Sequence, residues 1–381
     1  MKKQPIVVAQ IMGKWVGGGV EAVIMNYYRN IDRTKIQFDF ICDSDSTNIP
    51  YDEIKKLGGK VIICPPYQKV LKYEKFLIDL FKKNNYKIVH SNINALSVFP
   101  LRAAKKAGVP IRIAHSHSTT NKKEWKKNLM KQALRPFSKK YATDYFACTE
   151  HAGRWLFGDR TFEQGKVYIL NNAIDLDKYK YNQKIRKNIR KELGINDDTL
   201  VIGHIGRFVA QKNHTFLIDI FNELHKKKKN SILLLIGQGP LMDEIKEKVE
   251  MLGISDSVKF LGQRDDVNEL YNVMDLFLFP SLYEGLGMVL IEAQANGLPC
   301  IASTEVPPIA KVSDKAIFVG LEKTIKKWTE IVEENVVYDR IVDFNKIKEL
   351  GYDIVAEVNG LEKKYLDLNN QGGWLKKWRL L

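Results

Sequence analysis

Cysteine is scarce in this chain, and long apolar runs are absent. The 381 residues include four cysteines, at positions 42, 64, 148 and 300, and no two of them have the spacing of a metal site or a redox motif. We therefore expect reduced, mostly buried thiols and a cytosolic protein. No stretch approaches the ~18–20 apolar residues that a membrane-spanning helix needs. The start, Met1-Lys-Lys-Gln-Pro-Ile-Val-Val-Ala, resembles the beginning of a strand and is too short for a signal peptide.

Acidic residues are fewer than basic residues. The chain has 60 Lys and Arg residues against 45 Asp and Glu residues, which gives a formal net charge of +15 at pH 7. A nucleic acid, an anionic membrane surface or a phosphorylated small ligand would each explain this excess. No zinc-finger or RRM signature is present, and the aromatic residues are not interleaved with the basic runs. We therefore rank contact with a membrane surface first, plain solubility second and nucleic-acid binding third.

The length and the pattern of apolar runs predict two domains. Short apolar runs alternate with longer amphipathic ones, and the pattern stops near a lysine-rich stretch at 178–191 before it restarts. This alternation predicts two tandem α/β domains, each with a parallel sheet covered on both faces. The first is expected at 1–170 and the second at 171–349, with a helix at 350–369 that packs back on the first domain and a tail at 370–381. The predicted strands are residues 6–12, 38–42, 61–64, 88–91, 111–115, 145–149, 167–170, 200–205, 232–236, 258–261, 276–279, 300–303 and 317–319.

Ligands of open α/β sheets bind beyond the carboxyl ends of the strands. Two such sheets that face each other would form one interdomain cleft, and residues that follow strands are therefore the first candidates for a site.

Two glutamates flank a strand–turn–helix unit in the second domain. The apolar run 276–279 predicts a buried strand, Pro280 ends it, and the following glycines allow a tight turn before a mostly apolar helix. Glu284 lies in this turn and Glu292 about two turns into the helix, eight positions further on. At ~1.5 Å rise per residue this is roughly 12 Å, too far for an acid–base pair on one bond, whose members are roughly 5–10 Å apart. The spacing suits two contacts to one extended ligand, and a structural turn before a capped helix is the alternative.

Arg207 and Lys212 flank a loop after the first strand of the second domain and precede a helix. Arginine can hold two phosphate oxygens with its planar fork and lysine supplies a point charge, so the pair suits a diphosphate. Two solvated surface charges are the alternative. Another glycine turn, Gly237-Gln-Gly239, follows the next strand, and turn chemistry alone would explain it.

The segment Gly17-Gly-Gly-Val-Glu21 follows the first strand and opens a helix. Glycines let backbone N–H groups approach a phosphate closely, and the start of a helix attracts negative charge. Glu21 argues against a dinucleotide pyrophosphate bound directly at this point. A flexible turn without a ligand is the alternative.

The segment His115-Ser-His117-Ser follows the fifth strand. We expect the two histidine side chains to point to opposite sides, so that they do not bind one metal ion together and only one of them faces the ligand. A satisfied structural role is the alternative.

Three further signals are weak. Asp43-Ser-Asp45 matches the DxD pattern that holds a metal-bound nucleotide in some sugar transferases, but short acidic loops are common. Residues 121–140 carry eight Lys and Arg residues, with apolar residues at helical spacing, as in a helix that lies on a membrane surface; an ordinary exposed helix is the alternative. The tail, Trp374-Leu-Lys-Lys-Trp378-Arg-Leu-Leu381, repeats this composition, and a cloning remnant or a disordered end is the alternative.

Together these motifs resemble those of the retaining GT-B glycosyltransferases of group 4 (GT4). Glu284-Gly-Leu-Gly-Met-Val-Leu-Ile-Glu292 resembles the E-x7-E motif of that family, and Gly206-Arg207 with Lys212 resembles its GR…K segment. Asn172-Ala-Ile-Asp175 is similar to its N-G-[VI]-D segment, with Ala173 in place of glycine.

The order and spacing of the motifs match the family over residues 5–365, including the N-terminal glycine loop. Ile113-Ala-His-Ser-His117-Ser is most similar to the corresponding segment of bacterial exopolysaccharide and capsule members. One departure is Thr304-Glu-Val-Pro-Pro, where many relatives carry a glycine pair and a glutamate after the strand.

The resemblance implies two Rossmann-like domains and a role for each matching residue. Arg207 and Lys212 would hold the diphosphate of a nucleotide-sugar, and Glu292 would bind the ribose hydroxyls. Glu284 would contact donor hydroxyls near C3, and His117, with His115 as the alternative, would lie beside the reacting sugar. The implied donor-binding residues are Gly18, Gly19, Arg207, Lys212, Gly237, Arg264, Glu284, Gly285, Gly287 and Glu292, and the implied catalytic residues are Glu284, His117, Arg207 and Lys212.

We therefore expect a retaining glycosyltransferase that moves a sugar from a nucleotide-sugar, either a UDP-hexose or a UDP-HexNAc, to a lipid-linked or growing glycan in exopolysaccharide or capsule biosynthesis. Because two fixed cations can neutralise the leaving diphosphate, we expect neither a cofactor nor a metal site. The expected location is the inner face of the plasma membrane, in peripheral contact with anionic lipid and with no nucleic-acid partner. The alternatives are a sugar-nucleotide epimerase or hydrolase of the same fold and a non-catalytic basic binding protein.

Overall fold

The computed structural model describes the backbone of residues 4–117, 125–336 and 339–377, and the side chains in these ranges except those of 125–131 and 372–377. The chain folds as two compact units. The first comprises Met1–Ile174 and Gly351–Leu381, and the second comprises Asp175–Leu350.

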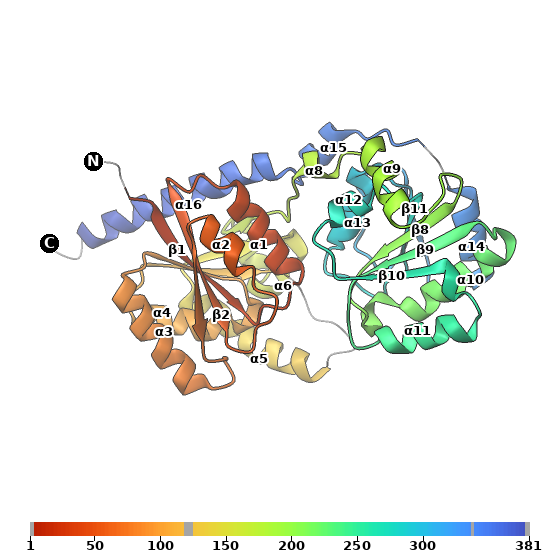
Figure 1. Ribbon diagram of the computed structural model, residues 1–381. Coiled ribbons are helices and arrows are strands. Elements are labelled where there is room, and N and C mark those ends of the chain that lie inside the picture. The colour runs from red at the N-terminus through yellow and green to blue at the C-terminus, as the bar shows by residue number, and fades with distance from the viewer. Residues whose placement is uncertain (1–3, 118–124, 337–338, 378–381) are drawn as a thin grey trace. The chain divides into compact units, whose positions relative to one another are not determined.

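The first unit is a seven-stranded parallel sheet with helices on both faces (Figure 1). Its strand order is β3-β2-β1-β4-β5-β6-β7, so the order reverses between β1 and β4. The strands are β1 (Ile6–Gly13), β2 (Ile36–Asp43), β3 (Lys60–Cys64), β4 (Ile88–Ser91), β5 (Ile111–Ser116), β6 (Asp144–Ala147) and β7 (Val167–Ile169). The helices are α1 (Gly19–Asn30), α2 (Tyr51–Lys56), α3 (Val70–Asn84), η1 (Asn94–Ser97), α4 (Val98–Lys106), α5 (Trp125–Tyr141), α6 (Glu150–Phe157), α7 (Asp159–Glu163) and α16 (Ile354–Lys377).

The second unit repeats this architecture with six parallel strands in the order β10-β9-β8-β11-β12-β13. Here the strand order reverses between β8 and β11. The strands are β8 (Leu200–Ile205), β9 (Ser231–Ile236), β10 (Val258–Gly262), β11 (Leu276–Phe279), β12 (Cys300–Ser303) and β13 (Ala316–Val319). The helices are α8 (Leu176–Tyr179), α9 (Gln183–Glu192), η2 (Ala210–Lys212), α10 (His214–Lys227), α11 (Met242–Met251), η3 (Ser255–Ser257), α12 (Val267–Leu270), α13 (Met288–Ala295), η4 (Pro308–Ala310), α14 (Ile325–Glu334) and α15 (Phe344–Glu349).

The predicted strands are all present, and their ends differ from the prediction by at most two residues. They were predictable because each is a short apolar run, which is the composition of a parallel strand covered by helices; the central strands are buried on both faces, whereas edge strands such as β3 and β10 are only partly buried. Neighbouring residues of one strand enter different cores. Val8 and Phe40 pack with α1 and α16, whereas Ala9 and Ile41 pack with α3 and α4 on the opposite face.

The last helix, α16, belongs to the first unit although it follows the second in sequence. Ile174 forms an isolated parallel bridge with Asp353 just before α16 begins, and Tyr365 of α16 is fully buried in the core of the first unit. The helix continues to Lys377, so the backbone of the expected tail is helical up to that residue. The tail's side chains from residue 372 onward lie outside the described residues, and its proposed membrane contact stays a prediction.

The predicted basic helix at 121–140 corresponds to α5, but its side chains up to residue 131 lie outside the described residues. Of the others, Leu134 packs against the core and Phe137 is 46% exposed.

The four cysteines are buried and unpaired, as the sequence predicts. In the part of the chain that the structure describes, no helix has both the length and the hydropathy required to cross a bilayer.

Candidate functional site

The two central strands of the second sheet bring the main candidate residues together. The loop after β8 contains Arg207 and Lys212, and the turn after β11 contains Glu284. β8 and β11 are parallel neighbours at the point where the strand order reverses (Figure 1). Both segments therefore leave the sheet side by side at the carboxyl ends of the strands. This is the position at which open α/β sheets bind their ligands.

Lys212 and Glu284 form an ion pair at this edge. The distance from Lys212 Nζ to Glu284 Oε1 is 2.7 Å, and the two side chains are 15% and 7% exposed. The ammonium also lies 4.8 Å from the centre of the Phe279 ring. The neighbouring Gln211 donates from Nε2 to Glu284 Oε2 at 3.2 Å and to the carbonyl of Tyr283 at 3.0 Å. Each carboxylate oxygen of Glu284 therefore has a donor, and the pair is held as a unit.

Glycine at position 206 lets Lys212 lie on the loop. A Cβ at Gly206 would approach Lys212 Cγ to 3.1 Å and His204 Nε2 to 3.0 Å. The glycine turn after β9 packs against the same loop, because a Cβ at Gly237 would lie 2.1 Å from the carbonyl oxygen of Gly206 and its φ is +135°. The close contact with Gly206 thus explains why residue 237 is a glycine, and its expected contact with a ligand remains a prediction.

Two further cations of the second unit differ in their partners. Arg207 is exposed, and among the described residues no ion pair is recorded for its guanidinium. Arg264, beyond the edge strand β10, instead forms a two-pronged pair with Asp266 at 2.8 and 2.6 Å. The arrangement leaves the Arg207 guanidinium available for an anion, whereas the side chain of Arg264 is already engaged.

Glu292 lies on α13, away from the partners of Glu284. Its Oε2 accepts from the hydroxyl of Tyr271 at 2.8 Å. Burial raises the pKa of Glu292, and hydrogen bonds from Tyr271 and Tyr179 partly offset this effect. A carboxylate with two phenol donors is well placed to accept from further hydroxyl groups, as the implied ribose contact requires.

The predicted position of Glu292 within its helix was wrong. Helix α13 begins at Met288, after Gly287 with φ +86°, so Glu292 lies about one turn inside it instead of two. The residues between Glu284 and Gly287 form a turn, to which the helical rise of ~1.5 Å per residue does not apply. The two glutamates nevertheless have separate partners, which agrees with two contacts to one ligand. A Cβ at Gly285 would meet nothing within 4 Å, so its implied donor contact remains a prediction.

In the first unit, the glycine loop follows β1 and α1 begins at Gly19. The carboxylate of Glu21 folds back over this loop, where Oε1 accepts from the backbone N–H of Val16 at 3.1 Å and Oε2 lies 3.0 Å from the Cβ position of Gly18. The Glu21 side chain therefore lies close to Gly18, and the expected approach of the Gly18 and Gly19 amides to a phosphate remains a prediction.

The expectation that His115 and His117 point to opposite sides was wrong. Their rings lie side by side, with centroids 3.8 Å apart and planes tilted by 37°. The physical reason is that side chains alternate along an extended chain with a period of two, so residues i and i+2 share a face. His115 is fully buried and His117 is 8% exposed, so His117 is the less buried of the two, and which of them faces a ligand remains a prediction.

The DxD pattern has structural partners. Asp43 is 1% exposed and its Oδ1 accepts from the thiol of Cys64 at 3.6 Å, while Asp45 pairs with Lys14 at 3.0 Å. Burial raises the pKa of Asp43 to about 6. Within the described ranges, no three His, Cys, Asp or Glu side chains are grouped as metal ligands.

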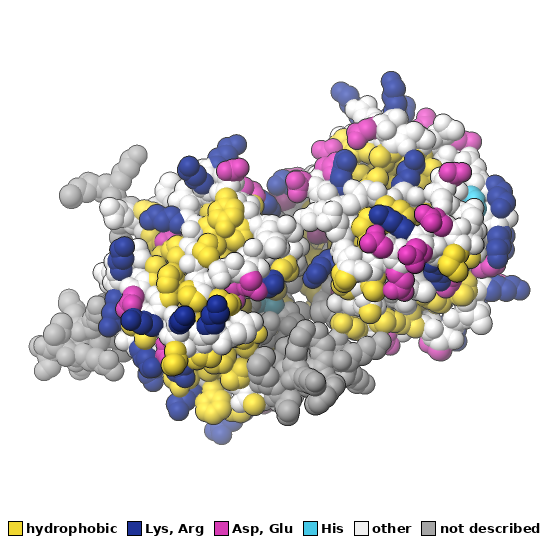
Figure 2. All heavy atoms as spheres, turned by 60° about the horizontal axis from the view of Figure 1, so that its bottom comes forward, with side chains coloured by type: hydrophobic (Ala, Val, Ile, Leu, Met, Phe, Trp, Pro, Cys, Tyr) yellow, Lys and Arg dark blue, Asp and Glu magenta, His cyan; other side chains and the backbone are white. Residues whose placement is uncertain are grey.

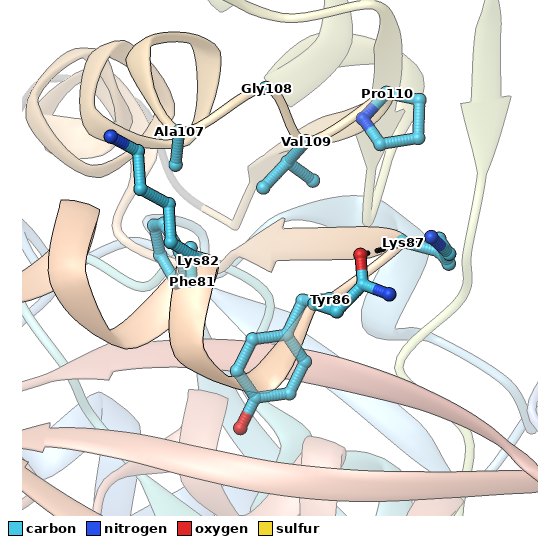
Figure 3. A pocket seen from close by; sticks show the side chains of 9 residues that line it. Phe81, Lys82, Tyr86, Lys87, Ala107, Gly108, Val109 and Pro110 are labelled. Carbon is cyan, nitrogen blue, oxygen red and sulfur yellow. Dashed lines mark hydrogen bonds between the residues drawn. The ribbon is translucent and has the colours of Figure 1, made fainter. Parts of the chain in front are cut away.

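A hollow in the first unit lies at the end of the sheet opposite to the one where the candidate residues lie (Figure 3). It is lined by the end of α3 and by the turns 85–87 and 107–110, which precede β4 and β5. These residues are at the amino ends of the strands, whereas the glycine loop and His117 follow carboxyl ends.

Several polar residues that contact the candidate site residues were not predicted from the sequence. Gln211 and Asn92 each follow a strand at the ligand-binding edge, and this position alone would have flagged them. Tyr271 and Tyr365 carry no local signal, because each contacts its partner only through the fold. Tyr365 lies 275 positions from His90, to which it is hydrogen-bonded.

Comparisons with known proteins agree with both halves of the chain. The model of Glycosyltransferase Family 4 matches residues 17–178, and that of Glycosyl transferases group 1 matches residues 185–334. A Bacillus subtilis (strain 168) protein named "Putative glycosyltransferase EpsF" is 35% identical over 357 residues, which are 91% of this chain and 93% of that protein. The Escherichia coli UDP-Gal:alpha-D-GlcNAc-diphosphoundecaprenol alpha-1,3-galactosyltransferase is 24% identical over 369 residues, 92% of this chain and 94% of that protein.

A solved structure has the same fold. The crystal structure of Anabaena Alr3699/HepE in complex with UDP and glucose matches with a TM-score of 0.71 at 17% identity, covering 97% of this chain and 99% of that one. Two parallel Rossmann-like sheets, the motifs at their carboxyl edges and a 35% identical relative over nearly the whole chain lead to one conclusion. The chain belongs to the family 4 glycosyltransferases and has their GT-B fold.

Proposed function

We propose that this glycosyltransferase moves a sugar from a UDP-sugar to a lipid-linked or growing glycan in exopolysaccharide or capsule biosynthesis, with retention of the anomeric configuration. The observation that carries the proposal is the Lys212–Glu284 pair at the strand-order reversal, beside the exposed Arg207. The name of the E. coli relative supports a UDP-sugar donor and a lipid diphosphate acceptor. The complex of the Anabaena protein with UDP and glucose supports the same class of donor.

The second unit would bind the donor through charges that it already holds in place. Cleavage of the bond between the sugar C1 and the phosphate oxygen builds negative charge on the diphosphate, and Lys212 and Arg207 would stabilise that charge. Lys212 would then exchange its carboxylate partner for the diphosphate, which frees Glu284 to accept hydrogen bonds from the sugar. Glu292, held by Tyr271, would accept from the ribose hydroxyls.

The first unit would contribute the Gly18 and Gly19 amides and His117, which follow β1 and β5. The acceptor oxygen would form its bond to C1 on the face that the phosphate leaves, and the departing phosphate oxygen would take the acceptor's proton. Because fixed cations carry the charge stabilisation, the proposal needs no divalent metal ion.

The test is the release of UDP from a panel of UDP-sugars, with and without a polyprenyl-diphosphate-sugar acceptor and with and without EDTA. Transfer that requires the acceptor, continues in EDTA and gives a product with the donor's anomeric configuration by NMR supports the proposal. Donor conversion without acceptor would identify an epimerase or hydrolase instead, and the absence of conversion with every donor would identify a binding protein.

We also propose peripheral contact between the first unit and anionic lipid. Figure 2 shows Lys and Arg side chains gathered beside exposed apolar side chains on the part of the surface where the first unit lies. On α3, Leu71 is 83% exposed and lies beside the exposed Lys72 and Lys75. An apolar side chain among lysines suits the interface of an anionic membrane.

Flotation with phosphatidylglycerol vesicles and with phosphatidylcholine vesicles would test this contact. We expect binding to the anionic vesicles only, and charge reversal at Lys72 and Lys75 should weaken it at least about tenfold. Charge reversal at Lys226 and Lys227 of the second unit is the matched control. Equal binding to both kinds of vesicle, or equal loss in both variants, would contradict the proposal.

A further inference from the structure

A chain of buried polar side chains runs through the first unit and ends at His117. At its centre, the hydroxyl of Tyr365 lies 2.6 Å from His90 Nδ1 and 3.1 Å from Gln10 Nε2. No member is more than 8% exposed. The six side chains come from β1, from β4 and the residue after it, from β5 and the residue after it, and from α16; they are Gln10, His90, Asn92, His115, His117 and Tyr365.

Two arms lead from Tyr365 to His115 and His117. In one arm, Gln10 is hydrogen-bonded to Asn92 at 2.9 Å, and Asn92 Oδ1 lies 3.2 Å from His117 Nε2. In the other arm, His90 Nε2 lies 3.0 Å from His115 Nδ1. Because the rings of His115 and His117 are in contact, the six side chains form a closed circuit, which we call the Tyr365 circuit.

One contact fixes the direction of the hydrogen bonds in this circuit. Asn92 Nδ2 lies 3.6 Å from the sulfur of Met12 and 2.9 Å from Gln10 Oε1. A thioether sulfur accepts but cannot donate, so the amide nitrogen of Asn92 faces Met12 and its carbonyl oxygen faces His117. His117 must then donate from Nε2, which leaves the lone pair on Nδ1.

The same direction continues through the second arm. Gln10 accepts from Asn92 and donates to Tyr365, and the hydroxyl hydrogen of Tyr365 then has His90 Nδ1, at 2.6 Å, as its acceptor among the described residues. His90 then donates from Nε2 to His115 Nδ1, and the proton of His115 is on Nε2. Burial lowers the pKa of His90 and of His117 to about 3, so both rings are neutral at physiological pH.

The circuit leaves two ring nitrogens without a partner among the described residues, His115 Nε2 and His117 Nδ1. With the direction above, the first is a donor and the second an acceptor, on rings 3.8 Å apart. An unpaired buried polar atom is costly, and both of these nitrogens are buried, His117 Nδ1 on a ring that is 8% exposed and His115 Nε2 on a ring that is fully buried. A hydroxyl group, which both donates and accepts, complements such a pair.

We propose that Tyr365, Gln10 and Asn92 are positioning residues that hold His117 in the Nε2-protonated tautomer, with the lone pair on Nδ1. The inference rests on the proposed function, in which His117 lies beside the reacting sugar. The side-chain amides of Gln10 and Asn92 do not transfer protons at physiological pH. The Tyr365 circuit therefore orients the His117 ring and does not carry protons to it. Helix α16, the last in the chain, thereby determines the tautomer of His117, which follows β5.

The direct test is the tautomer of His117 in the full-length protein. In a ¹⁵N-histidine-labelled sample, two-bond ¹H–¹⁵N correlations distinguish Nδ1–H from Nε2–H rings, and the variant His117→Gln assigns the signal. We expect the Nε2–H form for His117, His90 and His115. An Nδ1–H form of His117 would overturn the proposal, whatever the activity of the protein.

A matched pair of variants tests the role of the circuit in transfer. Tyr365→Phe removes the central hydroxyl, and Tyr28→Phe removes another buried hydroxyl of the same unit, which contacts Gln37 and the carbonyl of Leu57. We expect a similar loss of thermal stability in both variants. Only Tyr365→Phe should lower kcat, by about tenfold with the donor KM changed less than twofold, and give His90 and His117 a mixture of tautomers.

Wild-type kcat and tautomers in Tyr365→Phe, or an equal loss of kcat in Tyr28→Phe, would overturn the positioning role while transfer itself stands. If the wild-type protein releases no UDP from any donor, the proposed function fails, and the tautomer measurement still decides whether the Tyr365 circuit has the direction derived above.

Discussion

Replacement of Lys212 by methionine would separate the charge of this residue from its packing. Methionine keeps an unbranched stem over Gly206 and removes the ammonium that lies 2.7 Å from Glu284. Loss of one member of a well-buried ion pair costs about 3–5 kcal/mol, because the other charge stays buried without a counter-charge. Gln211 still donates to Glu284 and Lys212 is partly exposed, so we expect a smaller loss, about 2–3 kcal/mol.

Calorimetry and the UDP-release assay measure the two consequences. For a unit of this size, the loss in free energy of unfolding lowers the Tm by roughly 5–10 °C. Removal of one cation at the leaving diphosphate lowers kcat by about 10²–10³. The control is Lys226→Met, which breaks an exposed ion pair with Glu223 on α10 and should cost less than about 1 kcal/mol without an effect on transfer.

The double variant Lys212→Met with Glu284→Gln distinguishes the resting contact from the catalytic role. A neutral pair removes the buried unpaired charge, so stability should return to within about 1 kcal/mol of the wild type while transfer stays lost. If Lys212→Met alone is as stable as the wild type, the ion pair does not exist in the resting protein. If its kcat is unchanged, Lys212 does not stabilise the leaving group.

Three further changes follow from the same geometry. Gly206→Ala places a methyl group against the stem of the neighbouring lysine, and we expect a loss of about 1–2 kcal/mol by thermal melting and lower UDP release. Gln211→Ala removes a donor from Glu284 and should lower kcat about five- to tenfold with little change in donor KM, whereas Gln211→Glu should be worse because it sets two carboxylates side by side. Burial raises the pKa of Asp43 from 3.8 to about 6, so the folded state holds this proton more tightly than the unfolded state and stability falls as the pH rises through that window. Asp43→Asn should therefore stabilise the protein by about 2 kcal/mol at pH 8 and have little effect at pH 4 in urea unfolding, and Asp45→Asn, in an exposed pair, is the control.

The strands and the position of the donor-site residues could be predicted from the sequence. Each strand is a short apolar run, and such runs are visible without any knowledge of the partner strands. Residues that follow these runs are at the carboxyl edge of a parallel sheet wherever the strands pair, so Lys212 and Glu284 could be assigned to that edge.

The partners of those residues could not be predicted in the same way. The contact of Lys212 with Glu284 joins residues 72 positions apart and requires β8 and β11 to be neighbours, which the strand order decides. Gln211 and Tyr271 were missed for this reason, since each acts on a carboxylate from another segment. The prediction that the His115 and His117 side chains point to opposite sides was wrong for a different reason, since residues two positions apart on a strand share one face.

The sequence by itself determined two parallel α/β sheets, the loops at their carboxyl ends and the charges on those loops, because short apolar runs and turn chemistry are local properties of the chain. Only the tertiary structure decided which charges meet and which buried polar side chains are hydrogen-bonded to one another. Those outcomes depend on contacts between strands and a final helix that are distant in sequence.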